Sequence, residues 1–263
     1  MSLTDRISAA TVAEDEIGTV FTLGGVIGKS ASIYGRYFGK FVPLTAAMAL
    51  PEFILLLTNS DYAQSQYAAR GQLAAGASFK ISLLFPVLVL FLGVFAQGVV
   101  LRGAYMAASG GAVDMRDSFS QGLRRAFSLM AVTIMQTIGV AVGLLLLVVP
   151  GLILSAMLYV ALSACVIEGL SGVGSLNRSA ALTRGHRWKV FGIVLLTILI
   201  PAFADRLIEV LIIPFGVPAW AIAHYVEQVL SLSFEAVLGV VVYHDLRAAK
   251  EGLGNARIAT VFD

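Results

Sequence analysis

Four polar side chains fall at helical spacing in an otherwise apolar stretch near the end of the chain. His224, Gln228, Ser231 and Glu235 are separated by four, three and four positions, which places them on one face of an α-helix, with Glu227 beside that face. An ionisable group at the centre of a membrane costs about 2.5–3.5 kcal/mol, so it faces protein or water and avoids lipid. This face could therefore line a polar cavity or relay protons.

Other apolar segments supply partners for this polar face. Glu52, Gln97 and Gln136 each interrupt a different apolar run. A closed, hydrogen-bonded seam is the second interpretation and the one we favour, with Glu227 paired to Arg206. In either case we expect the face to be covered by protein.

Catalytic and metal-binding motifs of soluble enzymes are absent from the sequence. It contains no Gly-rich phosphate loop, no Gly-x-Ser-x-Gly elbow and no His-Glu-x-x-His helix. His186, His224 and His244 lie in separate segments, and Cys165 is the single cysteine. We therefore predict no catalytic residue, no metal site, no cofactor and no disulfide.

The composition is that of a membrane protein. Of 263 residues, 58% are hydrophobic and 13% charged, against roughly 25% charged in a soluble domain. A net charge of +2 gives no basis for nucleic-acid binding. Apolar runs of about 20 residues recur along the chain and predict membrane-spanning helices.

We expect an all-α, polytopic fold of six transmembrane helices in three hairpins. A polar leader (residues 1–17) without a signal peptide precedes one membrane domain (residues 18–252), and a cytoplasmic tail (residues 253–263) follows it. The predicted spans are residues 41–58, 81–101, 127–149, 152–167, 190–204 and 219–242.

Short amphipathic helices are expected before the first, third and fifth spans. The first covers residues 19–38, the second is capped by Asp117, and the third starts near Ser175 or Asn177 and stops at Gly185. These three segments resemble one another, which is explained equally well by duplication or by any basic boundary next to a span. The fifth span is short or kinks at Pro201, and residues 206–215 are predicted to form a small outer helix.

Positive charge is concentrated on one side of the predicted spans. Of the 18 Lys and Arg residues, all but Arg70, Lys80 and Arg206 fall on that side. By the positive-inside rule both termini are cytoplasmic, which an even number of spans satisfies, and we expect an inner-membrane location.

The basic side has two interpretations. Arg124, Arg125 and Lys189 are candidates for contact with anionic lipid headgroups, because each cation near an anionic leaflet gains roughly 1 kcal/mol. They could also do no more than fix topology, and we favour topology with incidental lipid contact. Membrane lipids are the expected partners, and no motif indicates a protein partner.

Three motifs carry a family resemblance. They are Pro150-Gly151, residues 166–188 (VIEGLSGVGSLNRSAALTRGHRW) and the tail segment beginning Tyr243-His244-Asp245. The order resembles the membrane domain of glycerophosphoryl diester phosphodiesterases and its six-span bacterial relatives. In that family the membrane region is accessory to a catalytic barrel that this sequence lacks, so the resemblance implies no diesterase activity.

The second motif also has a direct physical interpretation. Glu168 lies where the fourth span ends, and Arg178, Arg184 and Arg187 follow within reach. We expect an ion pair here, a structural latch that ties the connection to the helix end. Asp245 and the later Glu251 could fold back onto basic residues in the same way.

As to function, we expect a non-enzymatic scaffold or lipid-interacting component of the cell envelope. A small transporter that uses the polar face of the sixth span is the alternative, and a membrane enzyme acting on lipid headgroups is a weaker one. A water-accessible pocket at Glu235 or Glu227 would favour the transporter, whereas a dry, closed seam would count against it.

Overall fold

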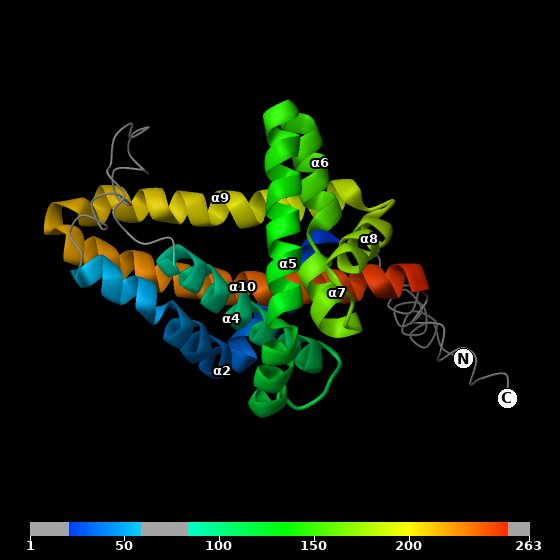
Figure 1. Cartoon of the computed structure of the whole chain (residues 1–263), viewed down its shortest axis with the longest axis horizontal. Helices are drawn as coiled ribbons and strands as arrows, with labels where there is room; N and C mark the ends of the chain where they lie inside the picture. The colour runs from blue at the N-terminus through cyan, green and yellow to red at the C-terminus, as the bar shows by residue number, and fades with distance from the viewer. Residues whose placement is uncertain (1–20, 59–83, 252–263) are drawn as a thin grey trace, which may run out of the picture.

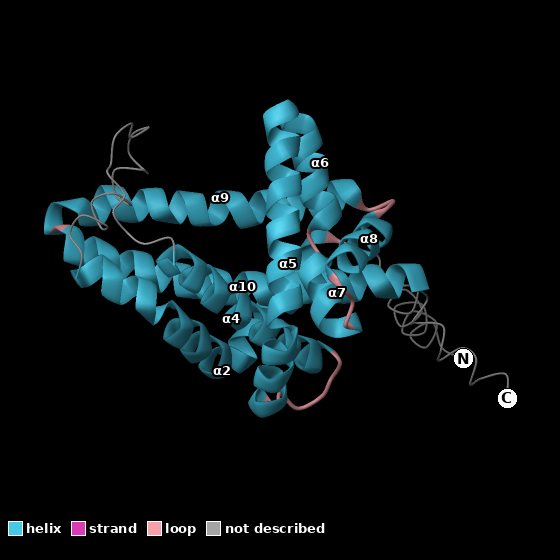
Figure 2. Cartoon of the chain, in the orientation of Figure 1, coloured by secondary structure: helices cyan, strands magenta, loops and turns pink. Residues whose placement is uncertain are grey.

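The computed structural model describes residues 21–58 and 84–251, and all regular structure in these ranges is helical. Figure 1 shows the arrangement and Figure 2 the helices with their short connections. The helices are α2 (Leu23–Thr58), α4 (Leu84–Ala108), α5 (Met115–Leu146), α6 (Val148–Leu158), α7 (Ala161–Glu168), α8 (Gly172–Thr183), α9 (Arg187–Ile212), a 3₁₀ turn η1 (Ile213–Phe215) and α10 (Val217–Glu251).

The predicted all-α, polytopic fold is confirmed. Within the described ranges, six helices are long and apolar enough to span a membrane, with α6 and α7 together forming one of them. Consecutive spans pack against each other as three hairpins: α2 with α4, α5 with α6 and α7, and α9 with α10. The protein is therefore a multi-pass membrane protein.

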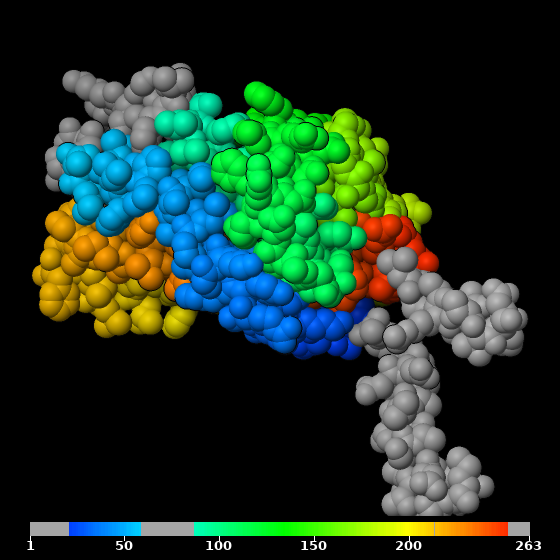
Figure 3. All heavy atoms as spheres, turned by 90° about the horizontal axis from the view of Figure 1, so that it is seen from below, coloured from blue at the N-terminus to red at the C-terminus, as the bar shows by residue number. Residues whose placement is uncertain are grey.

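Helix α10 is the centre of the fold. It packs against α2, α4 and α9, and residues 236–246 of α10 are buried except at position 244, with Tyr243 and Leu246 among them. Figure 3 shows α2 lying along α10 in the opposite direction, so that the start of α2 is beside the end of α10. Lys29 and Asp245 form an ion pair at that end, with 2.9 Å between Nζ and Oδ2. Side chains of α10 are thus held by neighbours on several sides.

The α5–α6 hairpin runs across the direction of α9 and α10 (Figure 1). Its two helices approach closely, because a Cβ on Gly143 would lie 2.9 Å from the Gly151 Cα. The tip carries consecutive exposed leucines, and Leu145 is 88% exposed. Side chains of this kind are suited to a lipid environment.

Several predicted helix boundaries are corrected by the structure. The amphipathic segments before the first and third spans are continuous with those spans, in α2 and α5, although the α2 backbone is non-helical at Tyr37. The cap of α5 is Asp114, not Asp117, because the Asp114 side chain accepts the backbone N–H groups of residues 116 and 117. The third segment is a separate helix, α8, which begins at Gly172.

Helix α9 also differs from the prediction. It continues through Pro201 to Ile212, so the expected outer helix over residues 206–215 does not form as a separate element. Gly185, with φ of +89°, follows the end of α8 as expected of a helix stop. The predictions for the leader and for the tail after residue 252 lie outside the described residues.

Candidate functional site: a polar helix between two cavities

The predicted polar face of α10 contacts more than one neighbouring helix. His224 Nδ1 lies 3.1 Å from Asp205 Oδ1 on α9. The Gln228 side-chain amide donates to the Glu52 carboxylate on α2, at 3.0 Å. The face therefore joins α10 to both α2 and α9.

Glu227 and Ser231 contact each other on α10. The Ser231 hydroxyl donates to Glu227 Oε1 at 2.6 Å. The expected partner of Glu227, Arg206, forms an ion pair with Glu209 one turn along α9. Glu227 instead lies near Asp205 and His224, with one polar atom of each within 4.8 Å of the others.

A cavity of about 240 Å³ opens on the side of α10 that faces α2 and α4. Glu52, Gln97, Gln228 and Thr133 contribute its polar lining. The Thr133 hydroxyl is buried and has no hydrogen-bond partner among the described residues, and the same is true of the Gln136 side-chain oxygen. The structure therefore brings Glu52, Gln97 and Gln228 to one cavity, in which the Thr133 hydroxyl is unsatisfied.

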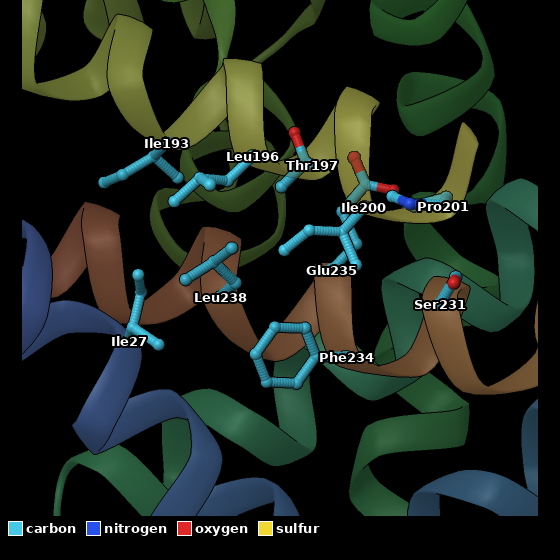
Figure 4. A pocket seen from close by; sticks show the side chains of 10 residues that line it. All are labelled: Ile27, Ile193, Leu196, Thr197, Ile200, Pro201, Ser231, Phe234, Glu235 and Leu238. Carbon is cyan, nitrogen blue, oxygen red and sulfur yellow. The ribbon is translucent and has the colours of Figure 1, made fainter. Parts of the chain in front are cut away.

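A second cavity, of about 180 Å³, lies between α9 and α10 (Figure 4). Its lining is apolar except for Glu235, Thr197 and Ser231. In Figure 4 the Glu235 side chain rises from α10 toward α9, close to Thr197 and Pro201. No hydrogen bond joins Glu235 to another residue of the described ranges. This carboxyl group can therefore accept a hydrogen bond from a donor that enters the cavity, or pair with a cation there.

At the other end of α10, Glu168 is the centre of an ionic network. The Arg178 Nε donates to Oε1 and Oε2 of Glu168, at 2.7 and 2.9 Å. The Tyr243 hydroxyl donates to the same carboxylate at 2.5 Å. Arg178 also pairs with Glu251, which accepts from Arg247 at 2.7 Å. The network thus connects α7, α8 and α10.

The two carboxylates of this network stabilise the charged form of Arg178. Burial lowers the pKa of Arg178, but its hydrogen bonds to Glu251 and Glu168 outweigh burial and leave that pKa raised. Its guanidinium therefore stays charged at any physiological pH. Of the three arginines proposed as partners of Glu168, Arg178 makes the contact.

Arg184 and Arg187 do not contact Glu168 within the described residues, which corrects the predicted latch. Gly185 turns the chain between α8 and α9, and Arg187 points into a different region. It lines a groove of about 400 Å³ formed by α6 and α9. The groove lining consists of Val149, Leu152, Ile153, Ala156, Arg187, Trp188 and Phe191.

The predicted lipid-headgroup candidates have different surroundings. Arg125 donates to the Gly169 carbonyl at 2.7 Å, and Lys189 donates to the Phe21 carbonyl at 2.9 Å. Arg124 is exposed. Two of the three candidates therefore contribute hydrogen bonds to the fold.

A known protein family matches the part of the chain that contains most of this site. Residues 70–248 match the family described as Domain of unknown function (DUF7847). The chain belongs to that family. No curated protein and no solved structure matches the chain.

The DUF7847 region contains the Glu168 network, the α6–α9 groove and nearly all of α10. Helix α2 lies before it, so Glu52 and Lys29 join the site from outside the matched range. The family description assigns no activity, and the resemblance to the phosphodiesterase membrane domain stays a proposal.

Some site residues were not predicted from the sequence. Tyr243 was noted only as part of a motif, although it hydrogen-bonds to Glu168 across 75 positions. Asp205 was not predicted to belong to the polar face, although it lies beside His224. No spacing rule links residues on different helices, so these two relationships carried no sequence signal.

Proposed function

We propose that this protein is a non-enzymatic, lipid-binding component of a bacterial inner membrane. Its site is the groove between α6 and α9, which holds an acyl chain, and the neighbouring cations hold an anionic headgroup. The main support for this proposal is the environment of Arg187. Its Nε is buried at the groove without a hydrogen-bond partner among the described residues, and an unsatisfied buried donor is costly unless a ligand accepts from it.

Positive charge near Arg187 favours an anion. Arg184 and Arg187 both lie close enough to Lys250 to repel its charge. An anionic headgroup relieves that repulsion, and each cation gains roughly 1 kcal/mol near anionic lipid. Three such cations correspond to about a hundredfold preference over a zwitterionic lipid.

The surrounding side chains suit a membrane boundary. Trp188, next to Arg187, is 81% exposed, and tryptophan is enriched at the level of the headgroups. The apolar lining from α6 suits a lipid tail. We place this end of the bundle on the cytoplasmic side, where the positive-inside rule puts the basic connections.

Lipid analysis of the purified protein tests this function. We expect anionic phospholipid to remain bound through detergent purification and to be detected by native mass spectrometry. The Arg184→Gln/Arg187→Gln double variant should lose it. The control is Arg36→Gln/Arg116→Gln, which removes the same charge from two exposed sites outside the groove. Equal retention by both double variants would refute the proposal.

A second candidate function is a small transporter, favoured by the cavity at Glu235. A carboxylate that faces an apolar cavity between two helices could accept a lipophilic amine or a proton. The cavity of Glu52 and Gln228 on the other side of α10 would extend the polar path. Uptake of a lipophilic amine into proteoliposomes, lost in Glu235→Gln and kept in the groove double variant, would support this candidate over the first.

A further inference from the structure

Three metal-ligand side chains meet near the turn between α9 and α10. Asp205 precedes the end of α9 by seven positions and His224 follows the start of α10 by seven, so both lie roughly 10 Å from the turn at 1.5 Å per residue. Glu227 is one turn beyond His224 on α10. One nitrogen or oxygen from each of the three lies within 4.8 Å of the other two.

The measured separation suits a shared ion. His224 Nδ1 and Asp205 Oδ1 are 3.1 Å apart. Two ligand atoms that each lie about 2.0–2.1 Å from a tetrahedral zinc ion are roughly 3.3 Å apart, so an ion fits between them with almost no movement. One Glu227 carboxylate oxygen lies within 4.8 Å of both atoms, where it can supply the third ligand.

Neighbouring residues hold two of the ligands in orientation. The His224 ring stacks on Trp220, with centroids 5.4 Å apart and an angle of 5° between the planes. The Ser231 hydroxyl donates to Glu227 Oε1, which leaves the other carboxylate oxygen for an ion. Hydrogen bonds that orient a ligating carboxylate in this way are a regular part of metal sites.

Burial and charge also fit a cation. His224 is only 5% exposed, whereas the Asp205 side chain is 31% exposed. Two carboxylates and one imidazole supply a charge of −2 when the imidazole is neutral, which a divalent ion balances.

We propose that Asp205, His224 and Glu227 form a binding site for a divalent transition metal ion, with zinc as the probe. One imidazole nitrogen and two carboxylate oxygens are a three-ligand set that leaves a position open for water or another ligand. The imidazole favours zinc, copper, iron or nickel over calcium and magnesium, which prefer oxygen ligands alone. The site ties the outer part of α9 to α10, away from the lipid groove.

Calorimetric titration of the full-length protein in detergent with zinc chloride tests the site. We expect one zinc ion to bind per chain. Magnesium and calcium should bind at least tenfold more weakly than zinc. His224→Ala should abolish zinc binding, and Asp205→Asn and Glu227→Gln should weaken it at least tenfold. Ser231→Ala removes only the orienting hydrogen bond and should weaken it by about 10-fold or more.

The matched control is His244→Ala. His244 is also on α10 and also faces an aspartate, with 3.6 Å to Asp245, but it does not belong to a group of three ligands in the described chain. Its loss should leave zinc affinity unchanged. The proposal is overturned if the wild type binds no zinc, or if His224→Ala and His244→Ala bind it equally.

Cobalt(II) provides a readout that does not depend on a variant folding well. A visible cobalt spectrum typical of four- or five-coordinate nitrogen and oxygen ligation should appear on titration of the wild type and disappear when zinc is added. Asp205→Asn keeps the size of the side chain and should lose the spectrum while unfolding at the wild-type temperature without metal. A spectrum retained in that variant would contradict the assignment.

Discussion

The Arg178 guanidinium donates to both carboxylate oxygens of Glu168, at 2.7 and 2.9 Å. The two side chains belong to α8 and α7, and both are largely shielded, with 26% and 19% of their side-chain surface exposed. Tyr243 from α10 completes the arrangement. This contact fixes the short helix α8 against the C-terminal part of α10.

Neutralising Glu168 should lower stability. In Glu168→Gln the side-chain shape is kept, but two charge-assisted hydrogen bonds to Arg178 are weakened, and each such bond contributes about 1.5–3 kcal/mol in favourable cases. Partial exposure reduces this, so we expect a loss of about 1–2 kcal/mol in the free energy of unfolding. Thermal unfolding in detergent measures it.

The control for this prediction is Glu209→Gln. Glu209 pairs with Arg206 within one turn of α9, and the Arg206 side chain is 62% exposed. Loss of this ion pair should therefore lower the free energy of unfolding by no more than about 0.5 kcal/mol. If Glu168→Gln is as stable as Glu209→Gln, the Glu168 contact does not stabilise the fold and the prediction is wrong.

Stability should also depend on His186, in the turn before α9. Burial, followed by the charges of Lys189 and Lys250, lowers the pKa of His186 below its usual value near 6.5. The unfolded chain then binds a proton at a higher pH than the folded chain does. The His186 contribution to stability is therefore present above about pH 6.5 and is lost as the pH falls below it.

His186→Phe isolates this contribution. The ring packs edge-on against Phe21, with centroids 5.6 Å apart, and phenylalanine can keep this aromatic contact without a titratable group. The unfolding temperature of the wild type should fall more steeply from pH 7.5 to 5.5 than that of the variant. Parallel curves for the two proteins would show that His186 does not contribute.

The fold was largely predictable from the sequence, because span number and hairpin pairing depend on long apolar runs. Helix ends were less predictable. Pro201 is a local signal for a kink, but α9 continues through it, and membrane helices tolerate proline more readily than soluble ones do. The cap of α5 was misplaced by three residues because Asp114 and Asp117 are both chemically suitable.

The site was predictable only along single helices. Spacing on α10 identified His224, Gln228 and Glu235, because periodicity within one helix can be read from numbering. The partners on other helices depend on how the hairpins cross. Arg178 could not be distinguished from Arg184 and Arg187 as the partner of Glu168, since the contact depends on how α8 packs against the end of α7.

Close packing in the α5–α6 hairpin gives a prediction about glycine. A Cβ on Gly151 would lie 2.6 Å from the backbone nitrogen of Leu144, which cannot move aside without disturbing α5. Gly151→Ala should therefore cost about 1–3 kcal/mol. Gly139→Ala is the control, since its Cβ would meet nothing closer than 4.0 Å and alanine favours a helix. The prediction fails if both substitutions raise the unfolding temperature.

Access to the cavity beside Glu235 can be measured with a single cysteine. Cys165 is buried, and Cys165→Ala provides a background without thiols. In that background Ser231→Cys, which lines the cavity between α9 and α10, should react with N-ethylmaleimide in intact membranes. Ser163→Cys should not react, because Ser163 is 1% exposed and packs near Gly239.

A lipophilic amine sharpens this last experiment. If the Glu235 carboxylate binds the amine inside the cavity, a long-chain alkylamine should slow labelling of Ser231→Cys, and Glu235→Gln should remove the protection. A simple alcohol of the same chain length controls for bulk effects on the membrane, because it lacks the positive charge. Labelling as slow as that of Ser163→Cys would instead indicate a closed seam along α10 and count against the transporter.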